Sequence, residues 1–222
     1  MREIVLDTET TGLDPASGHR IVEIACIELA NHLPTGRLFH HYVNPEREVP
    51  EAALAIHGLA DAFLKDKPLF GAIADEFLAF LAADRLVIHN AEFDLGFVNA
   101  ELKRASRPAL ACEVVDTLTI ARQRFPGAPA SLDALCKRFA IDLSARTKHG
   151  ARLDGELLAR VYLELIGGRQ PGLELATQAS AADPRGAAER PARPARAHAP
   201  APEELARHAA LLAKLKTPLW QA

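Results

Sequence analysis

The chain has 222 residues, with 26 Lys or Arg against 29 Asp or Glu, and its formal net charge is −3. This near balance excludes a uniformly basic surface, so any polynucleotide must be bound locally or be delivered by a partner. The three cysteines, Cys26, Cys112 and Cys136, form no Cys-x-x-Cys pair, which indicates reduced thiols. The sequence shows neither a signal-peptide core after Met1 nor an apolar stretch long enough to span a bilayer. We therefore expect a soluble, cytoplasmic protein.

Apolar, β-branched runs predict strands at 4–8, 21–29, 39–43, 86–88 and about 113–115. Apolar residues at helical spacing predict helices at about 50–56, 70–82, 93–104, 118–124, 132–139 and 152–166. Turn signals such as Leu33-Pro34-Thr35-Gly36 separate the first three strands, whereas the later strands alternate with helices. This order predicts an α/β fold in which an antiparallel meander leads into parallel strands. Ser131 is a suitable N-cap for the fifth helix.

Composition changes after Gly168, which divides the chain into three expected parts. Residues 1–168 form one sizeable domain, while residues 169–202 are rich in Ala, Pro and Arg and predict a flexible linker. Residues 203–222 begin with two acids and continue with apolar residues at helical spacing, which predicts an amphipathic helix. The apolar residues of this segment have no core of their own, which predicts that they dock onto a partner. They are Leu212, Leu215, Leu219 and Trp220. The alternative is that this tail packs back on the first domain.

Asp7 and Glu9 end the first apolar run, and they are the first candidates for a functional site. Side chains at positions i and i+2 of a strand leave the same face, so these two carboxylates point the same way. They repel each other unless a cation lies between them, and carboxylate oxygens are ligands that Mg²⁺ and Mn²⁺ prefer. The ordinary alternative is a strand end with two solvated acids.

Three later residues extend this set. Asp94 and Asp154 each come near the start of a predicted helix, and His149 lies in the loop before the second of these helices. Each residue alone has an ordinary interpretation, because acids are favourable near helix N-termini and a loop histidine is often exposed. Together they supply four carboxylates and one imidazole, which suits two divalent ions and a general base.

The arrangement Asp7-x-Glu9, His89-Asn90-x-x-Phe93-Asp94 and His149-x₄-Asp154 resembles the three exonuclease motifs of the DEDD superfamily, in its histidine branch. Within this branch the chain is most similar to the proofreading subunits of bacterial DNA polymerase III, over about residues 1–167 and also in the tail. The resemblance implies a ribonuclease H-like mixed β-sheet flanked by helices. It also implies 3′→5′ hydrolysis of mispaired nucleotides from DNA.

The resemblance further implies two Mg²⁺ (or Mn²⁺) ions held by four acids. Asp7 would bridge both ions, Glu9 and Asp154 would complete the site on the nucleophile side, and Asp94 would support the other. His149 would be the general base, since an imidazole with its ordinary pKa of about 6.5 can accept a proton at cytosolic pH.

Substrate contacts are expected beside this site. Thr10, Thr11 and Gly12 would present backbone N–H groups to the 3′ terminus, His57 would contact the terminal nucleotide, and Phe93 would stack near it. A packed or solvated His57 and a purely structural Phe93 are the alternatives.

The expected partners are the DNA 3′ end and two replication proteins. The resemblance implies that the C-terminal segment binds the polymerase catalytic (alpha) subunit. Gln170, Leu173 and Leu175 resemble a clamp-binding peptide, so the sliding clamp (beta) is a second expected partner, with ordinary linker sequence as the alternative. Two other functions stay open, namely a stand-alone RNase T-like or oligoribonuclease-like 3′→5′ exonuclease and a non-catalytic adaptor.

Overall fold

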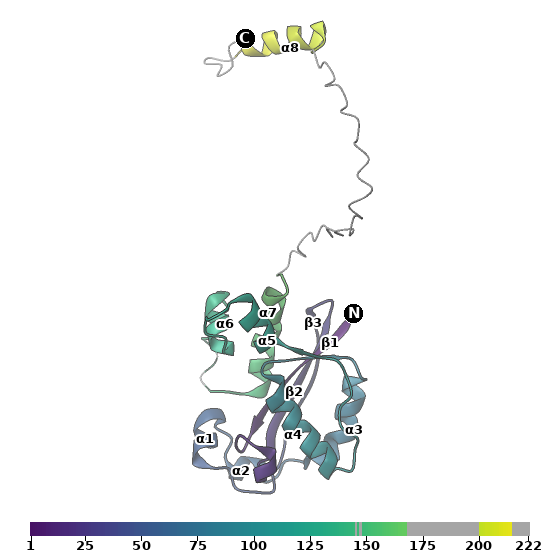
Figure 1. Cartoon of the computed structure of the whole chain (residues 1–222), viewed down its shortest axis with the longest axis vertical. Helices are drawn as coiled ribbons and strands as arrows, with labels where there is room; N and C mark the ends of the chain where they lie inside the picture. The colour runs from purple at the N-terminus through teal and green to yellow at the C-terminus, as the bar shows by residue number, and fades with distance from the viewer. Residues whose placement is uncertain (145, 147, 168–199, 215–222) are drawn as a thin grey trace, which may run out of the picture. The chain divides into compact units, whose positions relative to one another are not determined.

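The computed structural model describes residues 1–144, 146, 148–167 and 200–214. The chain divides into two units, which separate between Glu174 and Leu175. The first unit, drawn in Figure 1, is built on a sheet. The sheet has five strands in the order β3–β2–β1–β4–β5. Its strands are β1 (Arg2–Thr10), β2 (Ile21–Ala30), β3 (Leu33–Tyr42), β4 (Arg85–Ile88) and β5 (Val114–Asp116).

The sheet is mixed, as the order of the predicted elements indicated. β1 pairs antiparallel with β2, β2 pairs antiparallel with β3, and the pairs β1–β4 and β4–β5 are parallel. β3 starts at Leu33 rather than near Phe39, so the turn expected at 33–36 is part of a strand. The reason is that β3 lies at the sheet edge, where Pro34 is tolerated and residues 33–38 remain exposed, without an apolar pattern.

Helices cover both faces of this sheet. The helices of the first unit are α1 (Glu51–His57), α2 (Asp61–Leu64), α3 (Phe70–Leu81), α4 (Ala91–Arg104), α5 (Thr117–Arg124), α6 (Leu132–Arg138) and α7 (Ala151–Leu165), and a 3₁₀ turn, η1, spans Pro15–Ser17. Ile4 and Leu6 of β1 pack with α3 and α4 on one face, while Val5 packs with α7 on the other. α2 and η1 were not predicted, because three or four residues are too few to show a helical period.

α7 lies unusually close to the sheet because of one glycine. A Cβ atom at Gly155 would lie 3.2 Å from Ile27 Cδ1, closer than an ordinary van der Waals contact. The absence of a side chain there lets α7 pack directly against β1 and β2, and Leu158 is fully buried in this contact. The first turn of α7 is thereby fixed near the carboxyl end of β1.

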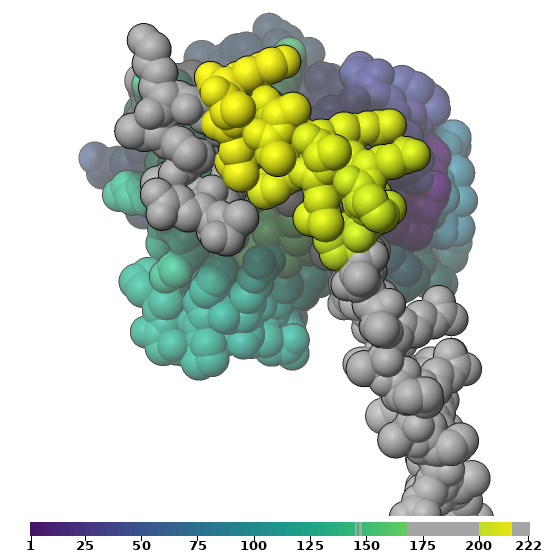
Figure 2. Space-filling model, turned by 90° about the horizontal axis from the view of Figure 1, so that it is seen from above, coloured from purple at the N-terminus to yellow at the C-terminus, as the bar shows by residue number. Residues whose placement is uncertain are grey.

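The second unit contributes the predicted amphipathic helix, α8 (Pro202–Leu212). Glu203 and Glu204 lie in its first turn, and the Glu204 carboxylate accepts a hydrogen bond from the Ala201 N–H (2.9 Å). No residue of α8 is buried within the described segment 200–214. Figure 2 shows one face of this helix in yellow. None of the described helices is long and apolar enough to cross a membrane.

Several predicted features fall outside the described residues. They are residues 169–199 of the expected linker, the residues Gln170, Leu173 and Leu175, and the tail residues Leu215, Leu219 and Trp220. Of the predicted partner contacts, Leu212 is described, and it is the last residue of α8.

Leu158 and Leu205 provide a matched pair of Leu→Ala substitutions that tests this packing. Leu158 of α7 is fully buried against the sheet, whereas Leu205 of α8 is 53% exposed. We expect Leu158→Ala to lower the free energy of unfolding by about 2–5 kcal/mol, because it leaves a cavity against the sheet. Leu205→Ala should change it by less than about 0.5 kcal/mol. Urea denaturation followed by circular dichroism measures both values, and equal losses would contradict the separate packing of α7 and α8.

Candidate active site

The site is built where β1 ends. Asp7 and Glu9 leave the face of β1 that is covered by α7, and Asp7 aligns with Ala25 while Glu9 aligns with Glu23 of β2. Thr8 points to the opposite face, where its hydroxyl donates to Asp94 Oδ1 (2.7 Å). Acids from both faces therefore meet around the last residues of one strand.

Asp94 reaches this place through a sharp reversal after β4. Asn90 adopts a left-handed conformation (φ 68°), and its backbone N–H donates to Asp116 Oδ1 (3.0 Å). α4 then begins at Ala91, which puts Asp94 in its first turn, where the residue is only 3% exposed. The predicted position of Asp94 just beyond a strand is confirmed.

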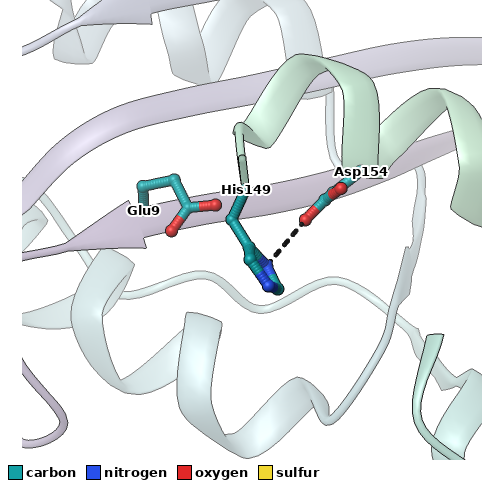
Figure 3. A group of neighbouring side chains, drawn as sticks. All are labelled: Glu9, His149 and Asp154. Atoms are coloured by element: carbon teal, nitrogen blue, oxygen red, sulfur yellow. Dashed lines mark ion pairs between the residues drawn. The ribbon is translucent and has the colours of Figure 1, made fainter. Parts of the chain in front are cut away.

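Asp154 and His149 come from the start of α7. Asp154 lies in the first turn, is 4% exposed, and its N–H donates to the Gly150 carbonyl (2.9 Å). The His149 N–H donates to the Ile56 carbonyl (3.2 Å), which ties the loop to α1. Glu9 of β1, His149 and Asp154 point toward one another in Figure 3, with 3.2 Å between His149 Nδ1 and Asp154 Oδ2.

These side chains offer a set of metal ligands. One atom each from Glu9, His149 and Asp154 lies within 4.8 Å of the other two, a separation that one cation can bridge. Asp7 and Asp94 do not belong to this tight group, but they are near enough for their charges to act on each other. The structure thus brings all four predicted acids and His149 to one place.

The electrostatics of the cluster favour a bound cation. Burial and the neighbouring carboxylates, Asp94 first, raise the pKa of Asp7 well above its usual range. Burial and the charge of Asp154 raise the pKa of Glu9 to about 8. Burial also raises the pKa of Asp94 to about 7, although the hydrogen bond from Thr8 opposes this shift. A cluster that disfavours its own negative charge needs protons or a cation, and its hard oxygen donors fit Mg²⁺ or Mn²⁺.

Arg146 is a member of the site that the sequence analysis missed. Its guanidinium donates from Nε to Asp154 Oδ1 (2.5 Å) and from Nη2 to Asp154 Oδ2 (2.6 Å), and Nη1 pairs with Asp133. The side chain is 8% exposed. Arg146 belongs to no motif, and the only signal in the sequence was a basic residue three positions before His149.

A cavity of about 560 Å³ adjoins the acids. All five predicted substrate contacts line it, namely Thr10, Thr11, Gly12, His57 and Phe93, together with Glu9. His19 and the 84%-exposed Leu13 also line it and were not predicted. The His19 ring lies so close to Gly12 that a Cβ there would be 2.4 Å from it, so a larger residue at this position would have to displace the ring. The volume of the cavity, about 560 Å³, is in the range of a small-molecule site.

His57 separates this cavity from a second one of about 340 Å³, which Glu23, His40 and His149 line. His57 Nδ1 accepts from the Leu59 N–H (3.0 Å), so the proton lies on Nε2, which has no partner among the described residues. Burial lowers the pKa of His57, which favours the neutral ring. His40 Nε2 contacts the buried Glu23 carboxylate beside the site (2.7 Å).

Comparisons with known proteins agree with this geometry. The RNase T family model, which describes exonucleases, matches residues 4–162. The DNA polymerase III subunit epsilon of Rickettsia conorii is 55% identical over 179 residues, which cover 79% of this chain and 78% of that protein. The Escherichia coli K12 subunit of the same name is 48% identical over 176 residues, covering 76% and 72%.

A solved structure supports the fold. Exonuclease X in complex with 5′-overhanging duplex DNA is 28% identical, with a TM-score of 0.58, and the match covers 74% of this chain and 90% of that one. This similarity confirms the predicted ribonuclease H-like fold.

The raised pKa of Glu9 predicts how stability depends on pH without metal. Between its ordinary pKa of 4.5 and about 8, the folded chain retains a proton that the unfolded chain has released. In EDTA the free energy of unfolding should therefore fall as pH rises from 5 to 8.5, by up to about 1.4 kcal/mol per pH unit for each retained proton. Mg²⁺ should reverse this loss, most strongly at high pH.

Urea denaturation in EDTA at a series of pH values measures this dependence. Glu9→Gln should make the free energy of unfolding fall less steeply with pH, whereas Glu48→Gln, at an exposed position, should leave the slope unchanged. A wild-type profile with the same slope as that of Glu9→Gln would show that Glu9 does not retain a proton.

Proposed function

We propose that this chain, which belongs to the RNase T family of exonucleases and within it to the epsilon subunits of bacterial DNA polymerase III, removes mispaired 3′-terminal nucleotides from DNA by two-metal hydrolysis. The products are nucleoside 5′-monophosphates, and the setting is the cytoplasm. One observation carries the proposal: four carboxylates and His149 meet beside a cavity lined by all the predicted substrate contacts.

The acids would hold two Mg²⁺ or Mn²⁺ ions. Glu9 and Asp154 offer ligand atoms within 4.8 Å of each other, and Asp7 and Asp94 lie beside them in the same electrostatic cluster. Divalent ions bound there supply neutralisation of the scissile phosphate and activation of the attacking water. The pKa values of Asp7 and Glu9 are raised because their ionised forms are unfavourable without a counter-charge.

His149 is proposed as the general base. It is half exposed, with 49% of its side chain accessible, so it can face solvent and substrate while its backbone N–H remains anchored to Ile56. Thr10, Thr11 and Gly12 would hold the 3′ end in the cavity. His57 would contact the terminal nucleotide, and Phe93 would stack near it.

The test is hydrolysis of 5′-labelled DNA and RNA with matched or mismatched 3′ ends. In Mg²⁺ we expect the chain to shorten DNA from the 3′ end and to favour the mismatch, because a frayed end enters the cavity more readily. Asp154→Asn should abolish turnover through the loss of a ligand charge, and His149→Ala should lower it about 10²–10⁴-fold. Asp75→Asn, at a 72%-exposed carboxylate outside the site, is the control.

Three results would contradict the proposal. They are near-normal turnover of Asp154→Asn, activity that persists in EDTA, and degradation of RNA in strong preference to DNA. The last result would favour a stand-alone RNA-trimming exonuclease.

We further propose that residues 203–222 bind the polymerase alpha subunit. Leu205 and Leu211 of α8 are 53% and 57% exposed, and amphipathic helices of this kind bind apolar grooves of partners. Leu212, Leu215, Leu219 and Trp220 are the proposed contacts, with Trp220 as the anchor. The sliding clamp (beta) is proposed as a second partner of Gln170, Leu173 and Leu175.

A deletion and a double substitution test the two proposed binding sites separately. Deletion of residues 203–222 should abolish co-purification with the alpha subunit, because it removes the apolar anchors, yet leave cleavage of free single-stranded DNA nearly unchanged. Gln170→Ala with Leu173→Ala should weaken clamp binding alone, measured by surface plasmon resonance. A truncated chain that still forms a stable complex with the polymerase would disprove the role of the tail.

A further inference from the structure

Arg146 occupies a place that the proposed mechanism does not use. Its guanidinium donates hydrogen bonds to both carboxylate oxygens of Asp154, at 2.5 and 2.6 Å, in the parallel geometry of a bidentate ion pair. Asp154 is also a proposed metal ligand, and its side chain is 5% exposed. In this arrangement a guanidinium therefore supplies the positive charge that the carboxylate cluster requires.

Arg146 also contacts the proposed base. Arg146 Nη2 lies 2.8 Å from His149 Nδ1, and a guanidinium can only donate, so Nδ1 must be the acceptor. The proton of the neutral ring is then on Nε2. With Nδ1 occupied and Nε2 protonated, neither nitrogen is free to accept a proton from water. This arrangement holds the base in an inactive tautomer.

A second arrangement is available to the same atoms. His149 Nδ1 lies 3.2 Å from Asp154 Oδ2 (Figure 3), a distance at which a proton on Nδ1 is donated to that carboxylate. Nε2 then carries a lone pair and can act as a base. The two arrangements exclude each other, because Nδ1 cannot accept from Arg146 and donate to Asp154 at once.

We propose that Arg146 is a positioning residue that exchanges with the divalent cation at Asp154 and thereby selects the tautomer of His149. In the cation-free site, Arg146 neutralises Asp154 and keeps His149 inactive. When Asp154 and Glu9 take a cation, Arg146 releases His149 and at least one Asp154 oxygen, and His149 donates from Nδ1 to Asp154. The inference rests on the proposed function for the identity of the base.

Asp133 gives Arg146 a second anionic partner outside the proposed metal site. It lies in the first turn of α6, its side chain is 50% exposed, and it pairs with Arg146 Nη1. A guanidinium that leaves Asp154 thus keeps one anionic partner and avoids being buried without a counter-charge. Arg146 therefore has a second anionic partner to retain when a cation occupies Asp154.

Mn²⁺ affinity, measured by isothermal titration calorimetry without substrate, tests the exchange. Arg146→Met keeps the bulk of the side chain but removes its charge and donors, and it should bind Mn²⁺ about tenfold more tightly than wild type. Arg146→Lys keeps the charge without the fork, so its affinity should lie between the two. The control is Arg107→Met, since Arg107 forms the same bidentate pair with the exposed Asp75 (2.6 and 2.7 Å).

The outcomes are distinct. Unchanged or weaker Mn²⁺ binding by Arg146→Met, with its circular dichroism spectrum intact, overturns the exchange but leaves the proposed function standing. A wild-type chain that binds no Mn²⁺ overturns both.

A second experiment detects the tautomer of His149 directly. It uses the wild-type chain, so it does not depend on the folding of a variant. In ¹⁵N NMR spectra of the metal-free wild-type chain, we expect the His149 ring to be protonated on Nε2 and bare on Nδ1. Saturating Mg²⁺ should move the proton to Nδ1. The same tautomer with and without Mg²⁺ would overturn the selection of the tautomer by Arg146.

Discussion

Repulsion among buried carboxylates at the carboxyl end of β1 is the constraint on which the rest of the site depends. Asp7, Glu9 and Asp94 all have pKa values raised by burial, and the neighbouring carboxylates add to the shifts of Asp7 and Glu9. Such a cluster is stable only with protons, with metal ions or with a cationic side chain beside it. The fold therefore has to supply a compensating charge whenever divalent ions are absent, and Arg146 is in the position to do so.

The fold offsets part of this repulsion through the placement of its helices. Asp94 and Asp154 lie in the first turns of α4 and α7, where the unpaired N–H groups of a helix favour negative charge. Thr8 adds a hydrogen bond to Asp94 from the opposite face of β1. The close packing of α7 at Gly155 keeps this helix end near the strand. Helix position and electrostatics are thus parts of one arrangement.

α7 and α8 show how similar sequence patterns lead to different outcomes. Both helices have apolar residues at helical spacing and acids in the first turn. α7 buries nine of its residues against the sheet and its neighbours, so its apolar face stabilises the first unit. Within the described part of the second unit, no residue of α8 is buried, so its apolar face has nothing of this kind to cover it. This difference motivates the proposal of a protein partner for α8.

The sequence by itself determined the local structure and the acidic motifs. Strand and helix patterns depend on neighbouring residues, so β1, β2, α3 and α7 could be read from hydrophobic spacing, and the N-cap at Ser131 from its side chain. The positions of the acids followed from the same spacing, because Asp7 and Glu9 lie in the last four residues of β1, and Asp94 and Asp154 lie in the first turns of α4 and α7.

Only the tertiary structure decided which distant residues complete the site. Glu23 faces Glu9 through the register of β1 and β2, and His19 lies close to Gly12 through the path of the loop between these strands. Arg146 reaches Asp154 because α7 and the segment before it fold back together. None of these residues has a local pattern that marks it, since each role depends on a neighbour that the folded chain supplies. Residue spacing records local backbone geometry, whereas ion pairs and cavities depend on packing between elements.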